Sequence, residues 1–377
     1  MDFSGDNELV AVGTAESYIR VWRMDGKPLP SLVDPASNNP DTPAVSASRR
    51  LIGHSGPVFA VSFSPSTANY ASAASSLSGI STASHHLLSS SADKTIRLWS
   101  LDTFSTLVIY KGHDHPVWDV QWGPFGHYFL SGSHDTTARM WSTDQVAPLR
   151  MFVGHDQDVD CVAWHPNNAY VFTGSSDKTV RMWDVSRGTA VRLLTAHTAN
   201  ITALSCAPNG RTLASADDAG AIILWDLSTG RRIKRMRGHA RGGIWSLSWS
   251  VESSLLVSAG ADGTVRVWDV NTPGEGQVGG ATTGAAKANG TVALDGVTTN
   301  GVTVNGTSGK ADGVLGAGKK GGAGAPGVGS VAKGISGSKE AGITPDQISA
   351  FATKKSPVYK VKFTNMNLVV AGGCYMP

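Results

Sequence analysis

The segment SGSHDTTARMW, residues 131–141, places Ser133, His134 and Asp135 in a row. Serine, histidine and aspartate are the residue types of a hydrolytic triad, in which a histidine base activates a hydroxyl and a carboxylate orients the base. An active site is built once in a chain. The triad interpretation therefore depends on whether this segment is unique.

The segment is not unique, because related segments that end in tryptophan recur along the chain. They end at Trp22, Trp99, Trp141, Trp183, Trp225 and Trp268. From Trp99 onward, successive tryptophans are 42, 42, 42 and 43 residues apart. A fixed period of this length indicates a repeat architecture. We therefore predict no catalytic residue in this segment.

The copies separate the polar residues of the segment into two kinds. Its aspartate recurs elsewhere as Asp93, Asp177 and Asp262, whereas the position of its histidine holds alanine or serine in those copies. Asp135 thus belongs to the repeated frame, and His134 is a feature of one copy.

A second mark precedes every copy except the one that ends at Trp22, a histidine that follows glycine or, once, alanine. These histidines are His54, His113, His155, His197 and His239. Each unit also reads as four short strands. In PVWDVQW, residues 116–122, Trp118, Val120 and Trp122 fall on one face, with the period of two of a half-buried strand.

Four-stranded units with Gly-His and Trp-Asp marks carry the signature of WD40 repeats, which build β-propellers. In WD40 proteins the histidine, a serine or threonine of the second strand, the turn aspartate and the tryptophan form a buried hydrogen-bonded set. The resemblance assigns this structural role to His54, Asp93, Trp99, His113, Asp135, Trp141, His155, Asp177, Trp183, His197, Trp225, His239, Asp262 and Trp268.

One copy departs from the pattern. The turn before Trp225 reads ADDAG, which places Asp218 seven residues ahead of the tryptophan rather than six. We expect a distorted set there.

The predicted fold is all-β, a seven-bladed WD40 propeller whose first and last blades are incomplete. The tail TKKSPVYKVKF, residues 353–363, aligns with GHSGPVFAVSF, residues 53–63, and begins a seventh blade without the histidine. Little precedes the first copy. An unclosed blade would expose strand edges, so we interpret the chain as a fragment or as one that starts too late.

Composition divides the chain into three parts. Residues 1–270 are assigned to blades one to six, with insertions at 31–50 and 66–86 that are rich in serine, alanine, asparagine and proline. Residues 271–349 contain no aromatic residue and are predicted to be a disordered loop, because they cannot bury enough apolar surface to offset their ordering entropy. Residues 350–377 are assigned to the strands of the seventh blade.

The bulk composition excludes several classes of function. The net charge of +3 does not by itself indicate nucleic-acid binding. The three cysteines form no Cys-x-x-Cys pair, which argues against a zinc site or a disulfide framework and fits a reducing compartment. No apolar run is long enough to span a membrane. We predict no metal and no cofactor.

Candidate interaction residues lie at the start of the first strand of each unit, which in WD40 proteins reaches the central channel on the top face. They are Phe59, Trp118, Asp160, Trp245 and Tyr359, with Thr202 at the remaining position and His134 on the same rim. Aromatic residues anchor interfaces. The alternatives are blade-to-blade packing for the aromatics and a solvated turn residue for His134.

The segment RRIKRMR, residues 231–237, has two interpretations as well. It could contact phosphates or acidic partners, or it is an outer strand with its basic side chains toward water.

Longer stretches resemble one family in particular. LIGHSGPVFAVSFSP, LDTFSTLVIYKGHDHPVWD and the tail TKKSPVYKVKFTNMNLVVAGG look like TBP-associated factor 5, the WD-repeat scaffold subunit of TFIID and, in fungi, of SAGA. The family also has a long N-terminal region with a LisH motif, which this sequence lacks.

The resemblance implies a nuclear, non-enzymatic scaffold that docks histone-fold TBP-associated factors and other TFIID or SAGA subunits for initiation by RNA polymerase II. It implies no small-molecule substrate and no membrane, and direct binding to DNA is not expected. The alternative is a WD40 reader of peptides or histone tails, or a ubiquitin-ligase substrate adaptor. An enzyme is disfavoured because most of the histidines belong to the repeat.

Overall fold

The computed structural model describes residues 1–27, 29, 48–65, 86–239, 242–272, 344–353, 356–364 and 367–373. These residues form strands and turns, and they all belong to one compact unit made of residues 1–277 and 340–377. None of them forms a helix of the length and apolarity needed to cross a membrane.

Six four-stranded antiparallel sheets follow one another along the chain. The first holds β1 (Asp2–Phe3), β2 (Leu9–Gly13), β3 (Tyr18–Arg23) and β4 (Ser48–Ile52). The second holds β5 (Val58–Phe63), β6 (His86–Ser91), β7 (Thr95–Ser100) and β8 (Ser105–Lys111). The third holds β9 (Val117–Trp122), β10 (Tyr128–Ser133), β11 (Thr137–Ser142) and β12 (Gln145–Val153).

The next three sheets repeat the same order of strands. The fourth holds β13 (Val159–Trp164), β14 (Tyr170–Ser175), β15 (Thr179–Asp184) and β16 (Ala190–Thr195). The fifth holds β17 (Ile201–Cys206), β18 (Thr212–Asp217), β19 (Ala221–Asp226) and β20 (Arg231–Arg237). The sixth holds β21 (Ile244–Trp249), β22 (Leu255–Gly260), β23 (Thr264–Asp269) and β24 (Gln347–Ala352).

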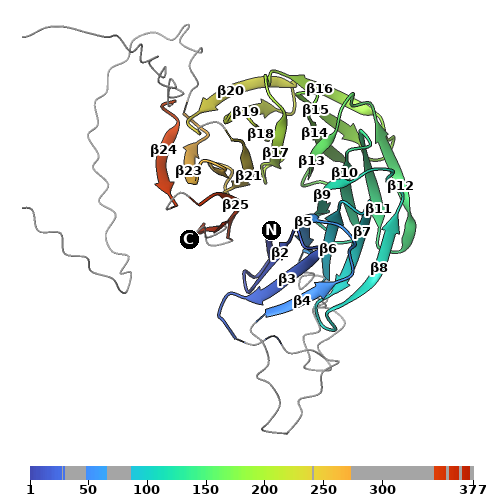
Figure 1. The fold of residues 1–377 in the computed structure, drawn as a ribbon. Helices are drawn as coiled ribbons and strands as arrows, with labels where there is room; N and C mark the ends of the chain where they lie inside the picture. The colour runs from blue at the N-terminus through green and yellow to red at the C-terminus, as the bar shows by residue number, and fades with distance from the viewer. Residues whose placement is uncertain are drawn as a thin grey trace, which may run out of the picture. The chain divides into compact units, whose positions relative to one another are not determined.

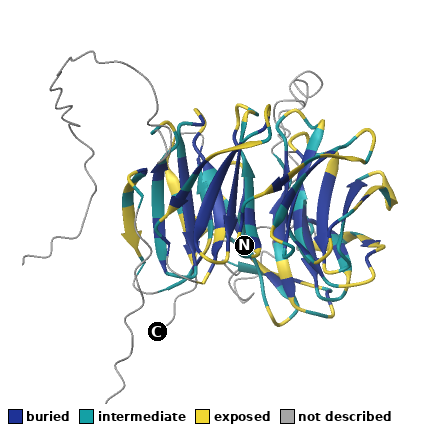
Figure 2. Cartoon of the chain, turned by 90° about the horizontal axis from the view of Figure 1, so that it is seen from above, coloured by how far each residue is buried: buried dark blue, intermediate teal, exposed yellow. Residues whose placement is uncertain are grey.

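The sheets are arranged around a central axis as the blades of a propeller (Figure 1). The first strand of each sheet lies at the axis and the fourth lies at the rim. The first three strands of a blade are mostly buried, whereas the fourth exposes alternate residues, as Leu107 and Ile109 of β8 illustrate. Exposed residues accordingly gather in the loops and the rim strands (Figure 2).

The hydrophobic core lies between neighbouring sheets. Trp141 of the third sheet is fully buried and packs in one cluster with Leu88 and Ile96 of the second. Closer to the axis the sheets approach so tightly that Gly132 is required, because a Cβ at this residue would lie 2.9 Å from the carbonyl oxygen of Val159. Each blade therefore completes its core with residues of the next.

The all-β propeller predicted from the sequence is confirmed, but the number of blades differs. The described residues form six four-stranded sheets, not seven, and one two-stranded sheet of β25 (Val358–Phe363) and β26 (Val369–Gly373). The prediction that the first blade is incomplete was wrong. Its inner strand, β1, has only two residues, too few for a periodic signal, yet it pairs with β2 and buries Phe3.

The boundaries of the insertions also differ from the prediction. Residues 48–50 belong to β4, the rim strand of the first sheet, and His86 begins β6. Residues 347–352 pair with β23 as the rim strand of the sixth sheet, so the predicted boundary at 350 was wrong. Rim strands are held by main-chain hydrogen bonds and are largely exposed, which leaves little hydrophobic pattern to read. The predicted disorder concerns a segment that lies almost wholly outside the described residues.

The two-stranded sheet joins the sixth sheet to the first. On one side, the main-chain N–H of Val361 donates to Ser246 Oγ at 3.1 Å. On the other, Lys362 Nζ donates to the carbonyl oxygens of Phe3 and Ser4, both at 3.0 Å. Burial lowers the pKa of Lys362. These main-chain contacts place β25 in the ring as an inner strand.

A buried ion pair secures the point where the chain returns to the sixth sheet. Lys234 of β20 and Asp346, just before β24, are both buried, and their side chains lie 3.4 Å apart. Lys234 Nζ also donates to the carbonyl oxygens of Asp269 and Thr272 at 2.8 and 2.9 Å. The lysine thus holds both ends of the excursion that separates β23 from β24.

We expect Lys234→Met to lower the free energy of unfolding by about 3 kcal/mol, because it leaves the buried Asp346 carboxylate without its cation. The double variant Lys234→Met, Asp346→Leu should recover part of this loss, since neither charge remains. Urea unfolding followed by tryptophan fluorescence measures both. Arg232→Met, which removes an exposed cation from the same strand, is the matched control, and an equal loss in that variant would contradict the role of the pair.

Candidate functional site

The histidine that begins each unit sits in a buried hydrogen-bonded set. In the third sheet, His113 Nδ1 lies 2.6 Å from Asp135 Oδ2, and His113 Nε2 lies 2.7 Å from Ser131 Oγ. Trp141 Nε1 donates to the same hydroxyl oxygen at 2.9 Å. In a neutral imidazole, this pattern is satisfied when Nδ1 donates to the carboxylate and Nε2 accepts the serine proton.

Four other sheets carry the same set. Histidine and carboxylate are joined at 2.7–2.9 Å, histidine and hydroxyl at 2.6–2.7 Å, and tryptophan and hydroxyl at 2.7–2.8 Å. Their members are His54, Ser89, Asp93 and Trp99; His155, Thr173, Asp177 and Trp183; His197, Ser215, Asp217 and Trp225; and His239, Ser258, Asp262 and Trp268. The structure therefore brings together every residue that the sequence assigned to these sets.

The connectivity of serine, histidine and aspartate in these sets is that of a hydrolytic triad, but the residues are not those of the opening motif. Ser131 is fully buried, and its hydroxyl is occupied by both His113 and the indole of Trp141. Ser133 bonds elsewhere, to the carbonyl oxygen of Pro116 at 2.8 Å. A buried hydroxyl with two partners offers no nucleophile to a substrate, so the sets are structural.

The set of the fifth sheet uses an aspartate that the sequence analysis did not identify. Asp217, which is fully buried, lies 2.9 Å from His197 Nδ1 through Oδ2 and accepts from the N–H of Ala221 at 2.8 Å through Oδ1. Asp218 is exposed. The hydrogen bonds of this set therefore have the same lengths as those of the other sets, and the expected distortion is absent. Asp217, at the end of β18, takes the place of the usual turn aspartate. The sequence held a signal for this substitution: Ala219 stands at the usual aspartate position, and two aspartates, Asp217 and Asp218, precede it.

The sets also shift the pKa values of their members. Burial raises the pKa of Asp93 and of Asp135, but hydrogen bonds from His54 and His113 outweigh it and hold both pKa values well below their usual range. Burial lowers the pKa of His113, against the hydrogen bond to Asp135. The carboxylates are thus charged and the imidazole neutral in the folded protein at pH 7.

Six residues of the inner strands form a ring at one end of the channel. In each inner strand from β5 to β25 the pairing register shifts around the second residue, which is left out of the ladder as a β-bulge. Bulges re-aim side chains. The bulged residues are Phe59, Trp118, Asp160, Thr202, Trp245 and Tyr359, and all six line the channel. We call them the mouth ring.

The aromatic members of the mouth ring form two pairs. The ring centroids of Phe59 and Trp118 are 4.6 Å apart, and those of Trp245 and Tyr359 are 5.0 Å apart and stacked at 12°. Three of these side chains stay 37–45% exposed. The predicted alternative of packing between blades therefore holds within each pair, but it leaves apolar ring surface open to the channel.

His134 lies beside the mouth ring rather than in it. Its Nδ1 is 2.5 Å from Asp158 Oδ2, which also accepts from Trp118 Nε1 at 3.2 Å. The imidazole is half exposed, and its edge faces the rings of Trp118 and His115. His134 thus orients a mouth-ring tryptophan through a shared carboxylate.

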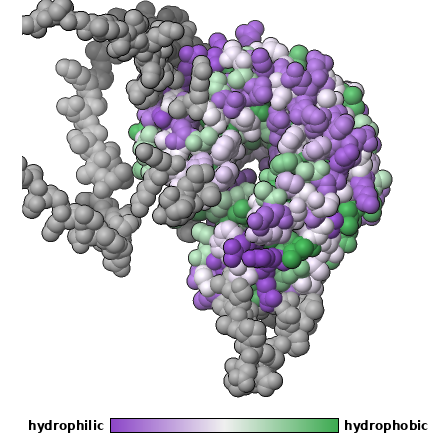
Figure 3. Space-filling model, in the orientation of Figure 1, coloured by the Kyte–Doolittle hydropathy of each residue, from purple (hydrophilic) through white to green (hydrophobic). Residues whose placement is uncertain are grey.

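The channel below the mouth ring is small and negatively charged. It encloses about 360 Å³ and is shown as the hollow at the centre of the ring in Figure 3. It is lined by the acidic side chains of Asp2, Asp119 and Asp160, by Lys360 and by Met1, whose buried amino group has its pKa lowered to about 6. Burial raises the pKa of Asp160 to about 6, against a 2.6 Å hydrogen bond from Ser176. An isolated carboxylate at this depth is poorly solvated.

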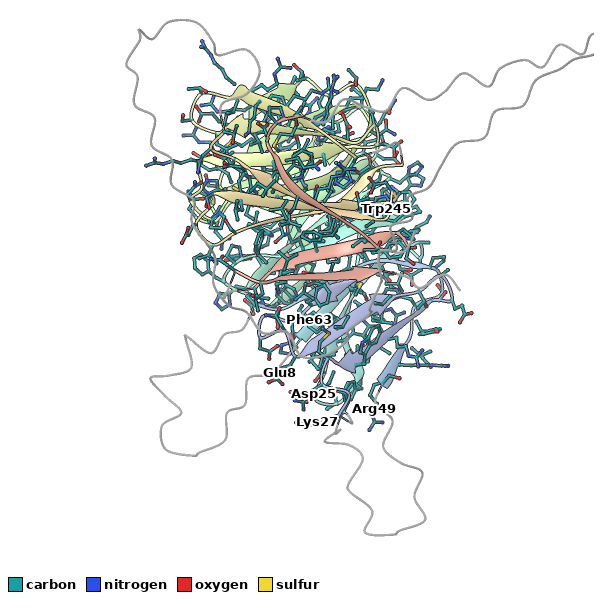
Figure 4. The ribbon with its side chains drawn as sticks, turned by 90° about the vertical axis from the view of Figure 1, so that its left-hand side faces the viewer. Glu8, Asp25, Lys27, Arg49, Phe63 and Trp245 are labelled. Atoms are coloured by element: carbon teal, nitrogen blue, oxygen red, sulfur yellow. The ribbon has the colours of Figure 1, made fainter. Side chains whose placement is uncertain are left out.

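Other charged groups lie away from this site. In Figure 4, Trp245 of the mouth ring lies far from Glu8, Asp25 and Lys27. Arg23 pairs with Glu8 and Asp25, and Lys27 pairs with Asp25. The basic segment 231–237 forms β20, a rim strand, but Lys234 is buried instead of turned toward water. The described part of the chain holds no group of three or more His, Cys, Asp or Glu side chains placed to bind a metal ion.

We expect Asp217→Ala to lower the free energy of unfolding by about 3 kcal/mol, because it strands two buried donors, His197 Nδ1 and the N–H of Ala221. Asp218→Ala should change it by less than about 0.5 kcal/mol, since that side chain is exposed. Urea unfolding of the two neighbouring variants measures the difference. Equal effects would show that the set of the fifth sheet uses the wrong aspartate.

We expect the fold to lose stability as the pH falls below about 6.5. The lowered pKa of His113 means that the unfolded chain binds protons there before the folded chain does. The carboxylates with lowered pKa values, such as Asp135, add to the loss below about pH 4, where the unfolded chain takes up their protons. Asp160 opposes it, because its raised pKa favours protonation in the fold below about pH 6.

Urea midpoints at pH 7, 5.5 and 4 test this dependence. The Asp160→Asn variant, which lacks the opposing group, should show a steeper fall between pH 6 and pH 4. A midpoint that stays constant or rises on acidification would contradict the protonation states assigned to the sets.

Two family models match the chain. The model described as IFT122 first beta-propeller matches residues 76–293, and that of the WD domain, G-beta repeat, matches residues 46–100. The first match covers more than half of the chain. Both agree with the blades seen in the structure.

Several curated proteins match as well. Transcription initiation factor TFIID subunit 5 of Encephalitozoon cuniculi is 34% identical over 132 residues, which are 33% of this chain and 21% of that protein. SAGA complex/transcription factor TFIID complex subunit Taf5 of Schizosaccharomyces pombe is 43% identical over 29% of this chain and 14% of its own length. TFIID subunit 5 of Arabidopsis thaliana is 47% identical over the same two shares.

These matches confirm the resemblance to TBP-associated factor 5, and the matched region spans about a fifth or less of the length of these relatives. With its six four-stranded blades and a family model that covers more than half of its length, this chain belongs to the WD40 β-propeller family represented by the first β-propeller of IFT122.

Proposed function

We propose that this chain is the propeller of a TFIID subunit 5 and acts as a non-catalytic scaffold in the nucleus. The observation that carries the proposal is the recurrence of TFIID subunit 5 among relatives from microsporidian, yeast, plant and animals. The buried, repeated Ser-His-Asp sets are consistent with a role without chemistry, since their hydroxyls have no access to a substrate.

The partners in this proposal are histone-fold TBP-associated factors and other subunits of TFIID, and of SAGA where that complex contains the protein. The propeller would help to organise them for initiation by RNA polymerase II. The mouth ring and His134 are the proposed contact surface, because this ring combines exposed aromatic side chains with a carboxylate at the opening of the channel.

We also propose that β25 and β26 form the inner part of a seventh blade. Three features support this: β25 has a bulge at Tyr359 as the other inner strands do, it lies against β21 of the sixth sheet, and it joins β1 through Lys362. In this arrangement the two-stranded sheet would occupy the seventh position around the axis, between the sixth sheet and the first.

A second candidate function is a WD40 reader of peptides, such as a histone-tail reader or the substrate adaptor of a ubiquitin ligase. The channel favours it, because a small charged cavity below a ring of aromatic side chains suits a single inserted side chain. The composition of the native complex distinguishes the two candidates.

Affinity purification of the tagged protein from nuclear extract, followed by mass spectrometry, tests the scaffold proposal. We expect TBP and histone-fold TBP-associated factors to be recovered, with acetyltransferase-complex subunits if SAGA contains the protein. The double variant Trp118→Ala, Trp245→Ala should reduce this recovery at least severalfold, whereas Phe125→Ala, which removes an exposed aromatic outside the mouth ring, should not. Recovery of a cullin or a histone-modifying enzyme in their place would refute the TFIID role.

A further inference from the structure

We propose that the mouth ring binds the cationic side chain of an arginine or lysine that a partner protein presents, held by the aromatic pairs and neutralised by Asp160. The inference rests on the proposed function only in taking the mouth ring as a contact surface. It adds the chemical class of the residue that this surface recognises.

The aromatic pairs supply the first part of the argument. Trp245 and Tyr359 keep 37% and 45% of their surface exposed although they stack on each other, and Phe59 keeps 41% beside Trp118. Phe59 and Trp118 come from the second and third sheets. Trp245 and Tyr359 come from the sixth sheet and the two-stranded sheet, so the two pairs lie in separate sectors of one ring. Aromatic faces attract cations, arginine in particular.

The charge of the channel supplies the second part. Asp2, Asp119 and Asp160 line it together with one lysine, Lys360, whose Nζ lies 3.6 Å from Asp2. Met1 also lines it, and burial lowers the pKa of its amino group to about 6, so this amine carries little charge at neutral pH. Among the described residues no ion pair joins Asp160 to a cation, and its carboxylate accepts a hydrogen bond from Ser176 Oγ at 2.6 Å. The cavity therefore has an excess of negative charge, which disfavours an anionic ligand and favours a cation.

Asp119 adds a second carboxyl group below the ring, although burial raises its pKa. It accepts main-chain N–H bonds from Val120 at 2.9 Å and Val162 at 3.0 Å, which hold its carboxylate in place beside the channel. A cationic group at the level of the mouth ring would thus meet Asp160 first and lie above Asp119.

The size of the cavity is the third part of the argument. A volume of about 360 Å³ is at the small end of ligand pockets, which span roughly 300–1,000 Å³. It accommodates one long side chain rather than a folded element. The remainder of the partner would lie across the face of the propeller, outside the channel.

Asp160 is also a residue that the fold does not need. Burial raises its pKa, so its charge at neutral pH opposes folding. A half-buried carboxylate with a raised pKa, placed in a channel, marks a candidate functional position. Replacement by asparagine keeps the shape and the bond to Ser176 while it removes the charge, so the variant is expected to fold with at least the stability of the parent at pH 7.

Fluorescence anisotropy with the purified full chain and four labelled peptides tests the inference. The peptides share a neutral Gly-Ser sequence and differ at the central residue, which is arginine, lysine, trimethyllysine or citrulline, the neutral isostere of arginine. We expect at least one cationic peptide to bind about tenfold more tightly than the citrulline peptide. The order of affinities then identifies the preferred cation.

Two variants and a control locate the binding. Asp160→Asn should abolish the preference for the charged peptides, and Trp245→Ala should weaken their binding about tenfold. Asp156→Asn, which removes an exposed carboxylate outside the channel, should leave binding unchanged. Thermal unfolding of each variant verifies that it is folded.

Equal binding of the citrulline and the charged peptides would overturn the inference, as would a Kd above about 1 mM for all four peptides or an unchanged preference in Asp160→Asn. The outcome is independent of the purification experiment. Recovery of TFIID subunits without cation binding would refute this inference alone. Cation binding without TFIID subunits would refute the scaffold and favour the reader.

Discussion

The buried hydrogen bonds of the histidines are the constraint on which the rest of the propeller depends. Each histidine lies between the rim strand of one sheet and the inner strand of the next, and it bonds to the second strand and the turn of that next sheet. His113, for example, follows β8 and binds Ser131 and Asp135 of the third sheet. Five such histidines serve the five crossovers between the six complete sheets. The set thus fixes the segment in which the chain passes from the rim strand of one sheet to the inner strand of the next.

The same constraint explains how residues with catalytic potential can be inert. The acid–base chemistry of a triad needs an accessible hydroxyl and a base that can take its proton. In this fold the indole N–H occupies the hydroxyl oxygen, the imidazole is buried, and the carboxylate in addition bonds its own turn, as Asp135 does with Thr137. Each group satisfies a neighbour that would otherwise be buried without a partner, so the hydrogen bonds that would serve catalysis stabilise the blade.

The sequence was sufficient to predict the parts of the fold that repeat. A period of 42 residues and two marks per unit located the histidines, the tryptophans and the order of the strands. What it could not predict depends on contacts that leave no periodic trace. β1 has two residues, β24 lies far from its sheet in the sequence, and Asp217 replaces the usual aspartate from another position in the turn. Main-chain pairing places β1 and β24 in their sheets, and the position of one carboxylate relative to His197 selects Asp217; neither is visible in the order of residues.

The candidate site shows the same division. The positions of the mouth ring could be predicted because they share one place in the repeat, but the cause, a β-bulge in each inner strand, is a property of the backbone. The aromatic pairs, the hydrogen bonds of His134 and the unneutralised carboxylate arise from contacts between different blades. A bulge removes one residue from the ladder and therefore frees its side chain from the pattern that the blade requires. Phe59, Trp245 and Tyr359 can thus vary without altering the main-chain ladders of their blades, whereas Thr202 and Trp118 also bond to the next blade through Ile244 and Asp158. For this reason the mouth ring is where a recognition function can evolve at little cost to the fold.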